Sequence, residues 1–201
     1  MKRYPRLPLP GHSRRSVLGR AVVVGAALGL GGRLGRALAR DATPRAGPVE
    51  FLWETRGDPA SPLGNPAHLA IAPDGSVWVA DGDNNRFQIF APDGSLLEVW
   101  GTAGSGEGEF DFTTIGWGGH DEAAIAFALD GTFYVTDTGN HRIQKFGPDR
   151  GFLTAWGSEG RQAGQFMVPH NVAVDSQGSL YISEVDTGQR VQRFRHADPR
   201  R

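Results

Sequence analysis

The chain of 201 residues contains no cysteine. Disulfide bonds, thiolate metal ligands and catalytic thiols are therefore excluded, and apolar packing must stabilise the fold. The apolar run at residues 21–32 holds about a dozen residues and is too short to cross a bilayer as a helix. No helical hydrophobic period of useful length follows residue 40. These absences favour an all-β protein.

Acidic residues are missing from the amino-terminal segment. Residues 1–39 hold eight lysines and arginines and no aspartate or glutamate. The segment around Arg14 and Arg15 resembles a twin-arginine export motif, and residues 37–39 fit a small-residue cleavage site. We expect a removable signal peptide and a periplasmic or extracellular protein without a stable membrane anchor; the alternative is a disordered basic tail. The expected organisation is signal peptide 1–39, linker 40–50, repeat segment 51–196 and carboxyl-terminal tail 197–201.

The charge of the remaining chain is strongly one-sided. All 22 acids follow residue 39, against 13 lysines and arginines there, a net charge of about −9. Phosphate backbones repel such a surface, so nucleic-acid binding is disfavoured.

One sequence pattern occurs three times. Residues 77–90 recur as residues 133–146 and again as residues 180–194. Asp81 and Asp137, which end corresponding apolar runs, are 56 residues apart. A nearly fixed period of this length, built from short alternating runs, indicates stacked β-units.

Each unit contains four expected strands. In the first unit these are residues 69–72, 77–81, 86–90 and 96–100. Asp-Gly pairs between them supply the positive φ of tight hairpin turns. Four antiparallel strands in about 45 residues are typical of a propeller blade. We therefore predict an all-β fold of about three four-stranded β-propeller blades, and expect Trp100 and Trp156 to be core residues of the fourth strands.

Residues 137–146, 152–157 and 164–166 carry a family resemblance. The run Asn140-His141-Arg142 and the recurring Trp-Gly and Gln-Phe pairs resemble an NHL repeat, over roughly residues 50–196. The resemblance implies a β-propeller, most often six-bladed.

Three predicted blades are too few to close a propeller ring. Residues 51–57 resemble a fourth strand, whereas the third unit stops after its third strand. Closed propellers need four to eight blades. The sequence leaves two alternatives: two copies pair as a homodimer that completes a six-bladed ring, or the chain is a truncated propeller fragment.

The repeated acids are expected to be structural. Asp81, Asp137 and Glu184 each precede an arginine that opens the next strand. Because a catalytic site usually breaks a repeat, we expect these acids to accept hydrogen bonds from loop amides and to pair with the arginines.

An insertion in the second unit is the best local candidate for a ligand site. Nine extra residues fall within residues 111–122, between an outer strand and the next inner strand. Loops on a rigid scaffold commonly carry function. Trp117, His120 and Asp121 are the expected ligand-binding residues, in an exported module that binds a peptide, glycan or protein through its loop face.

Histidines suggest a second candidate. His68 and His170 precede or open first strands, and His120 precedes the corresponding strand of the second unit; three converging imidazoles could bind zinc. Pro169-His170 is similar to a segment of peptidyl-α-hydroxyglycine amidating lyases, and that resemblance implies a zinc ligand at His170. The position of that family's tyrosine base holds Asp83. A zinc-dependent lyase is therefore the alternative function.

Overall fold

The computed structural model describes residues 50–113 and 123–195. The chain divides into two units, Met1–Pro48 and Val49–Arg201, and all described residues belong to the second. Within the described ranges, no helix is long and apolar enough to span a membrane.

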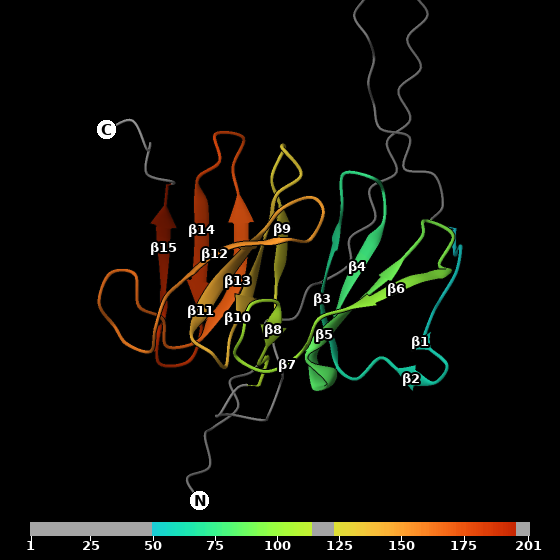
Figure 1. Ribbon diagram of the computed structural model, residues 1–201, viewed down its shortest axis with the longest axis horizontal. Coiled ribbons are helices and arrows are strands. Elements are labelled where there is room, and N and C mark those ends of the chain that lie inside the picture. Colours follow the sequence, from blue (N-terminus) through green and yellow to red (C-terminus); the bar gives the residue numbers. More distant parts are fainter. Residues whose placement is uncertain (1–49, 114–122, 196–201) are drawn as a thin grey trace, which may run out of the picture. The chain divides into compact units, whose positions relative to one another are not determined.

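Three antiparallel sheets follow one another along the chain (Figure 1). Blade 1 comprises β3 (Pro66–Ile71), β4 (Val77–Asp81), β5 (Arg86–Phe90) and β6 (Leu96–Trp100). Blade 2 comprises β9 (Ile125–Phe127), β10 (Phe133–Asp137), β11 (Arg142–Phe146) and β12 (Phe152–Trp156). Blade 3 comprises β13 (Pro169–Val174), β14 (Leu180–Glu184) and β15 (Arg190–Phe194). The predicted all-β class and the propeller-type blades are confirmed.

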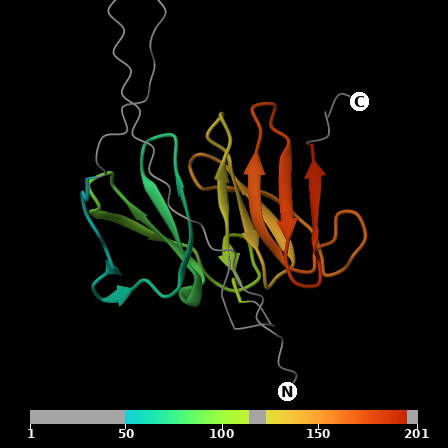
Figure 2. The same cartoon turned by 180° about the vertical axis from the view of Figure 1, so that it is seen from behind.

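Short elements connect the blades. They are β1 (Gly57–Asp58), β2 (Ser61–Pro62), the 3-10 turn η1 (Gly82–Asn84), β7 (Thr102–Ala103) and β8 (Glu109–Phe110). The inner strands β3, β9 and β13 lie side by side, because β9 contacts both of the others. Figure 2 shows the same order of blades from behind. No closed ring is detected in the part of the chain that the structure describes.

The expected hairpin turns occur where the Asp-Gly pairs predict them. Between β3 and β4, Asp74 accepts hydrogen bonds from the backbone N (2.9 Å) and Oγ (2.6 Å) of Ser76. Gly75 adopts a φ of +86°, which only glycine reaches without strain. Three of the four strands predicted for blade 1 have the predicted bounds; the inner strand is Pro66–Ile71 rather than 69–72.

Aromatic side chains fill the space between blades 1 and 2. Trp78 lies 5.2 Å from Phe133, and Trp100 lies 5.0 Å from Phe146, measured between ring centroids. Between blades 2 and 3, Trp156 packs against a cluster that includes the buried Leu180. Trp100 and Trp156 thus have the core role that the sequence predicts, and packing between blades stabilises the fold.

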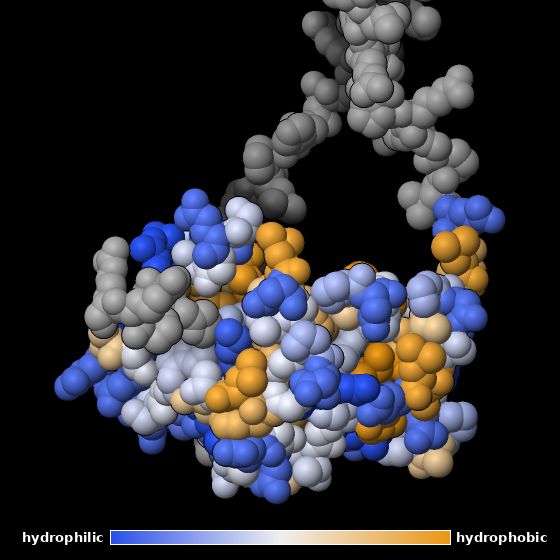
Figure 3. Space-filling model, turned by 45° about the horizontal axis from the view of Figure 1, so that its top comes forward, coloured by the Kyte–Doolittle hydropathy of each residue, from blue (hydrophilic) through white to orange (hydrophobic). Residues whose placement is uncertain are grey.

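The two outward faces of this stack are less covered. Leu69 and Ile71 of β3 are 60% and 59% exposed, and Val191 of β15 is 66% exposed. Figure 3 shows hydrophobic side chains on the surface at the end that carries blade 1, at the right of the view.

The amino-terminal strand expectation needs a correction. Residues 51–56, expected as part of a fourth strand, join no sheet; pairing begins at Gly57, where β1 meets β2. Instead, Trp53 donates a hydrogen bond from Nε1 to the backbone oxygen of Pro92 (2.9 Å), in the β5–β6 turn. The reason is that a fourth strand pairs with a third strand, and the third strand of blade 1, β5, is already paired with β4 and β6. Blade 3 has no fourth strand among the described residues, as expected.

Candidate functional site

Each blade carries a buried acid at the end of its second strand. In blade 2, Asp137 accepts hydrogen bonds from the backbone N of Asp111 (2.8 Å), Arg142 Nε (2.6 Å) and Gln144 Nε2 (2.9 Å). The same bonds join Asp81 to Gly64, Arg86 and Gln88, and Glu184 to Met167, Arg190 and Gln192. We call each set of acid, arginine and glutamine a loop clamp. The predicted structural role of the acids is confirmed.

The loop clamps hold the segment that arrives from the preceding blade. Arg142 Nη2 donates to the backbone oxygen of Gly106 (2.7 Å), and Gln144 Nε2 donates to that of Glu109 (2.7 Å). In blade 1, Arg86 and Gln88 bind the backbone oxygen of Ser61 in the same way. Residues 57–64 therefore occupy the place of an inter-blade loop.

The pKa values of the clamp acids differ with their surroundings. Burial raises the pKa of Asp137 above its usual range, despite the hydrogen bonds from Asp111 and Arg142. At Asp81 burial also acts upward, but hydrogen bonds from Gly64, Arg86 and neighbouring side chains lower its pKa overall. Glu184 follows Asp81: its pKa is lowered because its hydrogen bonds outweigh burial. Burial therefore outweighs the hydrogen bonds at Asp137 alone, although Asp81 is also fully buried.

A hollow of about 310 Å³ opens at the clamp end, between blades 2 and 3. We call it the clamp-end hollow. Its lining residues come from the inter-blade loops and from the turns that join the second and third strands: Asp111, Thr113, Thr138, Gly139, His141, Glu159, Met167, Val168 and Thr187.

The imidazole of His141 belongs to a residue that lines this hollow. Its Nδ1 lies 2.6 Å from the backbone oxygen of Met167, so Nδ1 carries the proton in the neutral ring. Nε2 is then a hydrogen-bond acceptor. In the turn that positions this ring, His141 adopts a φ of +53°. Asn85 adopts the same φ in the corresponding turn of blade 1.

Two carboxylates add to the acceptors around His141. Asp111 accepts a hydrogen bond from the backbone N of Thr113 (3.0 Å) and another from its hydroxyl. A Cβ on Gly139 would lie 2.5 Å from Cγ of Asp111, so the glycine leaves the space that this carboxylate occupies. Glu159 is exposed at the rim. The hollow is therefore rich in acceptors and suits a ligand that carries donors or positive charge.

The expected ligand-binding residues Trp117, His120 and Asp121 lie outside the described residues, which stop at Thr113 and resume at Ala123. The segment that contains them leaves the described chain at Thr113, on the lining of the clamp-end hollow. Sequence reasoning missed His141 and Glu159 as lining residues. The available signal for His141 was its place in the repeated turn, but the turn alone does not show which neighbour the ring faces.

The two described histidines of the zinc prediction lie close enough to interact electrostatically. Burial lowers the pKa of His68; a hydrogen bond to the Ile125 backbone acts upward, and the charge of His170 acts downward. These histidines belong to the inner strands of blades 1 and 3, which both lie beside β9. Residues 50–113 and 123–195 contain no group of three histidine, cysteine, aspartate or glutamate side chains placed to hold a metal. His120 falls outside those ranges.

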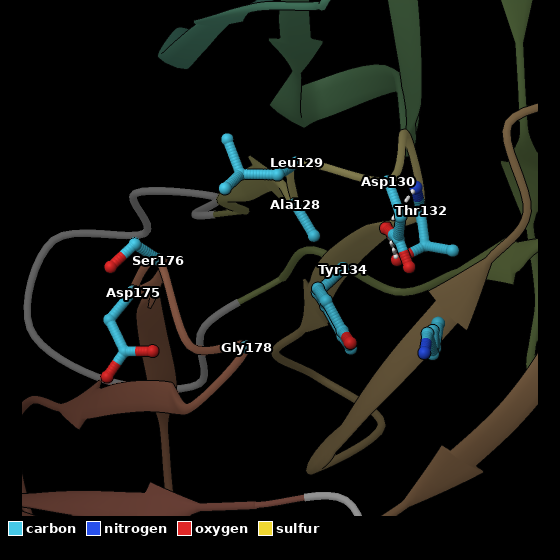
Figure 4. A pocket seen from close by; sticks show the side chains of 9 residues that line it. Ala128, Leu129, Asp130, Thr132, Tyr134, Asp175, Ser176 and Gly178 are labelled. Carbon is cyan, nitrogen blue, oxygen red and sulfur yellow. Dashed lines mark hydrogen bonds between the residues drawn. The ribbon is translucent and has the colours of Figure 1, made fainter.

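A second groove lies at the opposite end of blades 2 and 3 (Figure 4). It has a volume of about 230 Å³, with Asp130, Thr132 and Tyr134 on one side and Asp175 and Ser176 on the other. A corresponding groove of about 150 Å³ lies between blades 1 and 2. Both pairs of adjacent blades form such a groove, so it is a consequence of how neighbouring hairpins pack.

Comparison with known proteins agrees with the repeat architecture. Residues 63–90 and 124–146 match the NHL repeat family. The chain carries NHL repeats. Each matched segment contains the loop clamp's acid, and the first match reaches from Leu63 through β5, so the family pattern covers the loop as well as the strands.

Two curated relatives share about a third of their aligned residues with the chain. Human NHL repeat-containing protein 3 is 32% identical over 107 residues, which cover 50% of this chain and 28% of the relative. Peptidyl-glycine alpha-amidating monooxygenase A of Xenopus laevis is 33% identical over 143 residues, covering 66% and 14%. The chain therefore spans less than a third of the length of either relative.

A solved structure supports the fold alone. A structural genomics protein of unknown function from Bacteroides thetaiotaomicron matches with a TM-score of 0.53 at 17% identity, covering 69% of this chain and 38% of that one.

Proposed function

We propose that this NHL-repeat protein is a binding module that holds a basic peptide segment of a partner in the clamp-end hollow. The carrying observation is the chemistry of the lining, which includes the carboxylates of Asp111 and Glu159 and the imidazole of His141. Peptide amides, lysine and arginine supply the donors that such a lining needs.

The charge of the chain supports a basic ligand. Residues 40–201 carry 22 acids and 13 lysines and arginines, so they attract cations at long range. Trp117, His120 and Asp121 belong to the proposed site, because their segment leaves from the hollow's lining. An aromatic ring and a further carboxylate would add contact area and negative charge.

The experiment titrates three fluorescent heptapeptides, rich in lysine, glutamate or serine, into the purified protein. The lysine peptide should bind at least tenfold more tightly than the other two, and Glu159→Lys should weaken its binding at least tenfold. Glu107→Lys is the matched control, since Glu107 is exposed in the preceding inter-blade loop and does not line the hollow. Equal binding of all three peptides, or equal effects of the two variants, contradicts the proposal.

Export belongs to the same proposal. A periplasmic or extracellular binding module agrees with the basic, acid-free residues 1–39 and the arginines at positions 14 and 15. Fusing residues 1–39 to a reporter should give export that Arg14→Lys together with Arg15→Lys abolishes; unchanged export would contradict the twin-arginine route.

A zinc-dependent lyase is the second candidate function. The observation that favours it is the electrostatic proximity of His68 and His170. These two imidazoles would hold the metal with His120 as the third ligand, and zinc would supply a Lewis acid there. Asp83, at the position of the related lyases' tyrosine, is an exposed residue of η1. Stoichiometric zinc in the purified protein, lost in His170→Ala, would favour this function; zinc-free protein after growth in zinc would exclude it.

A further inference from the structure

On the outward face of blade 1, residues are exposed whose equivalents in blades 2 and 3 are buried. Leu69 corresponds to Ile125 of blade 2 and Val172 of blade 3, by their pairing with the second strand of each blade. Leu69 is 60% exposed, whereas Ile125 is 2% and Val172 is 4% exposed. In blades 2 and 3 the preceding blade covers this position.

The loop before blade 1 shows the same difference. Leu63 lies three residues before β3, as Phe166 lies three residues before β13. Phe166 is fully buried between blades, whereas Leu63 is half-buried. Blade 1 therefore has the side chains of an inner blade without the neighbour that would cover them.

Blade 3 lacks the complementary part. In blades 1 and 2 the third strand pairs on both sides, with β6 completing blade 1 and β12 completing blade 2. In blade 3, β15 pairs with β14 and has no second neighbour among the described residues. An unpaired strand edge is a template for another strand.

Residues 51–56 have the place of an outer strand. The loop clamp of blade 1 holds residues 57–64 as an inter-blade loop, so the segment before Gly57 corresponds to β6 or β12. Glu98 of β6 reaches Arg150 in the β11–β12 turn of the next blade (2.5 Å). Trp53 reaches the corresponding β5–β6 turn at Pro92 and Gly94. Trp53 therefore corresponds to Glu98, and Thr55 to Trp100.

One chain cannot join these two parts itself. The blade 1 clamp ties Gly57 and Asp58 beside Gln88, and the whole of blade 2 lies between blade 1 and β15. Figures 1 and 2 show β1 and β15 at opposite ends of the stack of blades.

We propose that two copies of this chain pair at both ends, each adding residues 51–56 to β15 of the other. We take the register of this pairing from β11 and β12 of blade 2, where Ile143 faces Trp156 and Phe146 faces Phe152. They place Val191 opposite Thr55, Arg193 opposite Trp53, and Phe194 opposite Phe51 of the second copy. The pairing covers Phe51, which is 76% exposed. A one-residue slip would turn Trp53 away from the next blade, so the register is fixed.

The blade faces meet in the same arrangement. Tyr181 of β14 corresponds to Trp78 of β4, whose ring lies 5.5 Å from Phe127 of the next blade. Ile71 corresponds to Phe127, so Tyr181 of one copy packs on Ile71 of the second copy. Val191 likewise meets Leu63, because Val191 corresponds to Phe87, whose ring lies 5.8 Å from Phe110 of the following inter-blade loop. Each copy thus buries an apolar face and closes a strand edge, and two identical contacts close the assembly.

Light scattering coupled to size exclusion tests the proposal on the purified full chain of 21.6 kDa. We expect twice that mass at micromolar concentration. Val191→Lys and, separately, Ile71→Lys should each raise the concentration of half-dissociation at least tenfold. Leu129→Lys, at a site that is 87% exposed in the β9–β10 turn, should leave it unchanged.

Circular dichroism shows whether each variant keeps the β-sheet content of the parent chain. A folded monomer overturns the proposal, as does a concentration-dependent series of larger oligomers, which would mean that the ends join without closing. A dimer that neither Val191→Lys nor Ile71→Lys weakens would also overturn it. Because the clamp-end hollow lies within one copy, peptide binding by a monomer would separate this failure from that of the proposed function.

Discussion

The middle blade and the two terminal blades are built on one pattern but differ in burial. In blade 2 both faces are covered: Phe133 on one face and Tyr134 on the other are 1% and 2% exposed. In blade 1, Leu69 on the outward face is 60% exposed, and in blade 3 Val191 is 66% exposed. Stability in such a stack is close to a sum of blade terms and neighbour terms. The difference between the blades is therefore a difference of neighbours.

The largest expected effect of a single substitution is at the central loop clamp. Asp137→Ala removes a fully buried carboxylate, which is the acceptor of Arg142 Nε and one of the two acceptors of Gln144 Nε2. We expect the free energy of unfolding to fall by about 3–5 kcal/mol. Glu184→Ala should cost less, because Arg190 is more exposed than Arg142, 28% against 19%. Urea unfolding measures both, and an equal or larger cost at Glu184 would contradict the comparison.

Substitutions at equivalent apolar positions of blades 1 and 2 should differ in their cost in unfolding free energy, by almost as much as the loss expected for Asp137→Ala. Ile125→Ala leaves a cavity between blades 1 and 2, and we expect it to cost about 2–5 kcal/mol of unfolding free energy. Leu69→Ala, at the corresponding exposed position, should cost under about 1 kcal/mol within one copy. Urea unfolding at a concentration below the half-dissociation point isolates this single-copy effect. Equal costs would mean that the outward face of blade 1 is covered within the copy.

The clamp acids should respond to pH in opposite directions. The lowered pKa of Asp81 contributes stability above the unfolded value of about 4, and this is lost as pH falls through the folded pKa. The raised pKa of Asp137 gives a contribution that is complete below about pH 4 and is lost as pH rises through the folded pKa.

Urea unfolding from pH 3 to pH 7 measures this contrast. Asp81→Asn should cost more at pH 7 than at pH 3, and Asp137→Asn should cost more at pH 3. Each unit of pKa shift corresponds to about 1.4 kcal/mol. The same pH trend in both variants would contradict the opposite directions of the two pKa shifts.

The smallest effect is expected at a surface ion pair. Arg150 and Glu98 lie 2.5 Å apart, with 32% and 45% of their side chains exposed. Glu98→Gln should change the free energy of unfolding by less than about 1 kcal/mol, because water screens such a pair. A loss as large as that of Asp137→Ala would show that this contact between blades 1 and 2 contributes as much to stability as the central loop clamp.

Much of the fold could be predicted because the repeat gives strand bounds and turns directly. The strands 77–81 and 86–90 and the clamp acid Asp81 follow from alternation, Asp-Gly turns and the recurring pattern. The state of residues 51–56 could not be predicted, because a strand forms only beside a partner. Their sequence resembles an outer strand, but the partner strand is missing from their own end of the stack.

The candidate site was less predictable. The insertion begins with residues of the clamp-end hollow, since Asp111 and Thr113 line it, and its ligand-binding role stays a prediction. The roles of His141 and Glu159 depend on how blade 3 sits against blade 2, and local sequence does not encode that placement. The electrostatic interaction between His68 and His170 agrees with the arrangement of the inner strands, because β3 and β13 both lie beside β9.

The most direct test of the paired ends uses the absence of natural cysteine. Thr55→Cys and Val191→Cys are made in separate chains, mixed and oxidised. Residues facing each other across a ladder have Cβ atoms close enough for a disulfide. The account predicts a covalent dimer from the mixture and none from either chain alone. No covalent dimer in the mixture, or as much from Leu129→Cys mixed with Thr55→Cys, would contradict it.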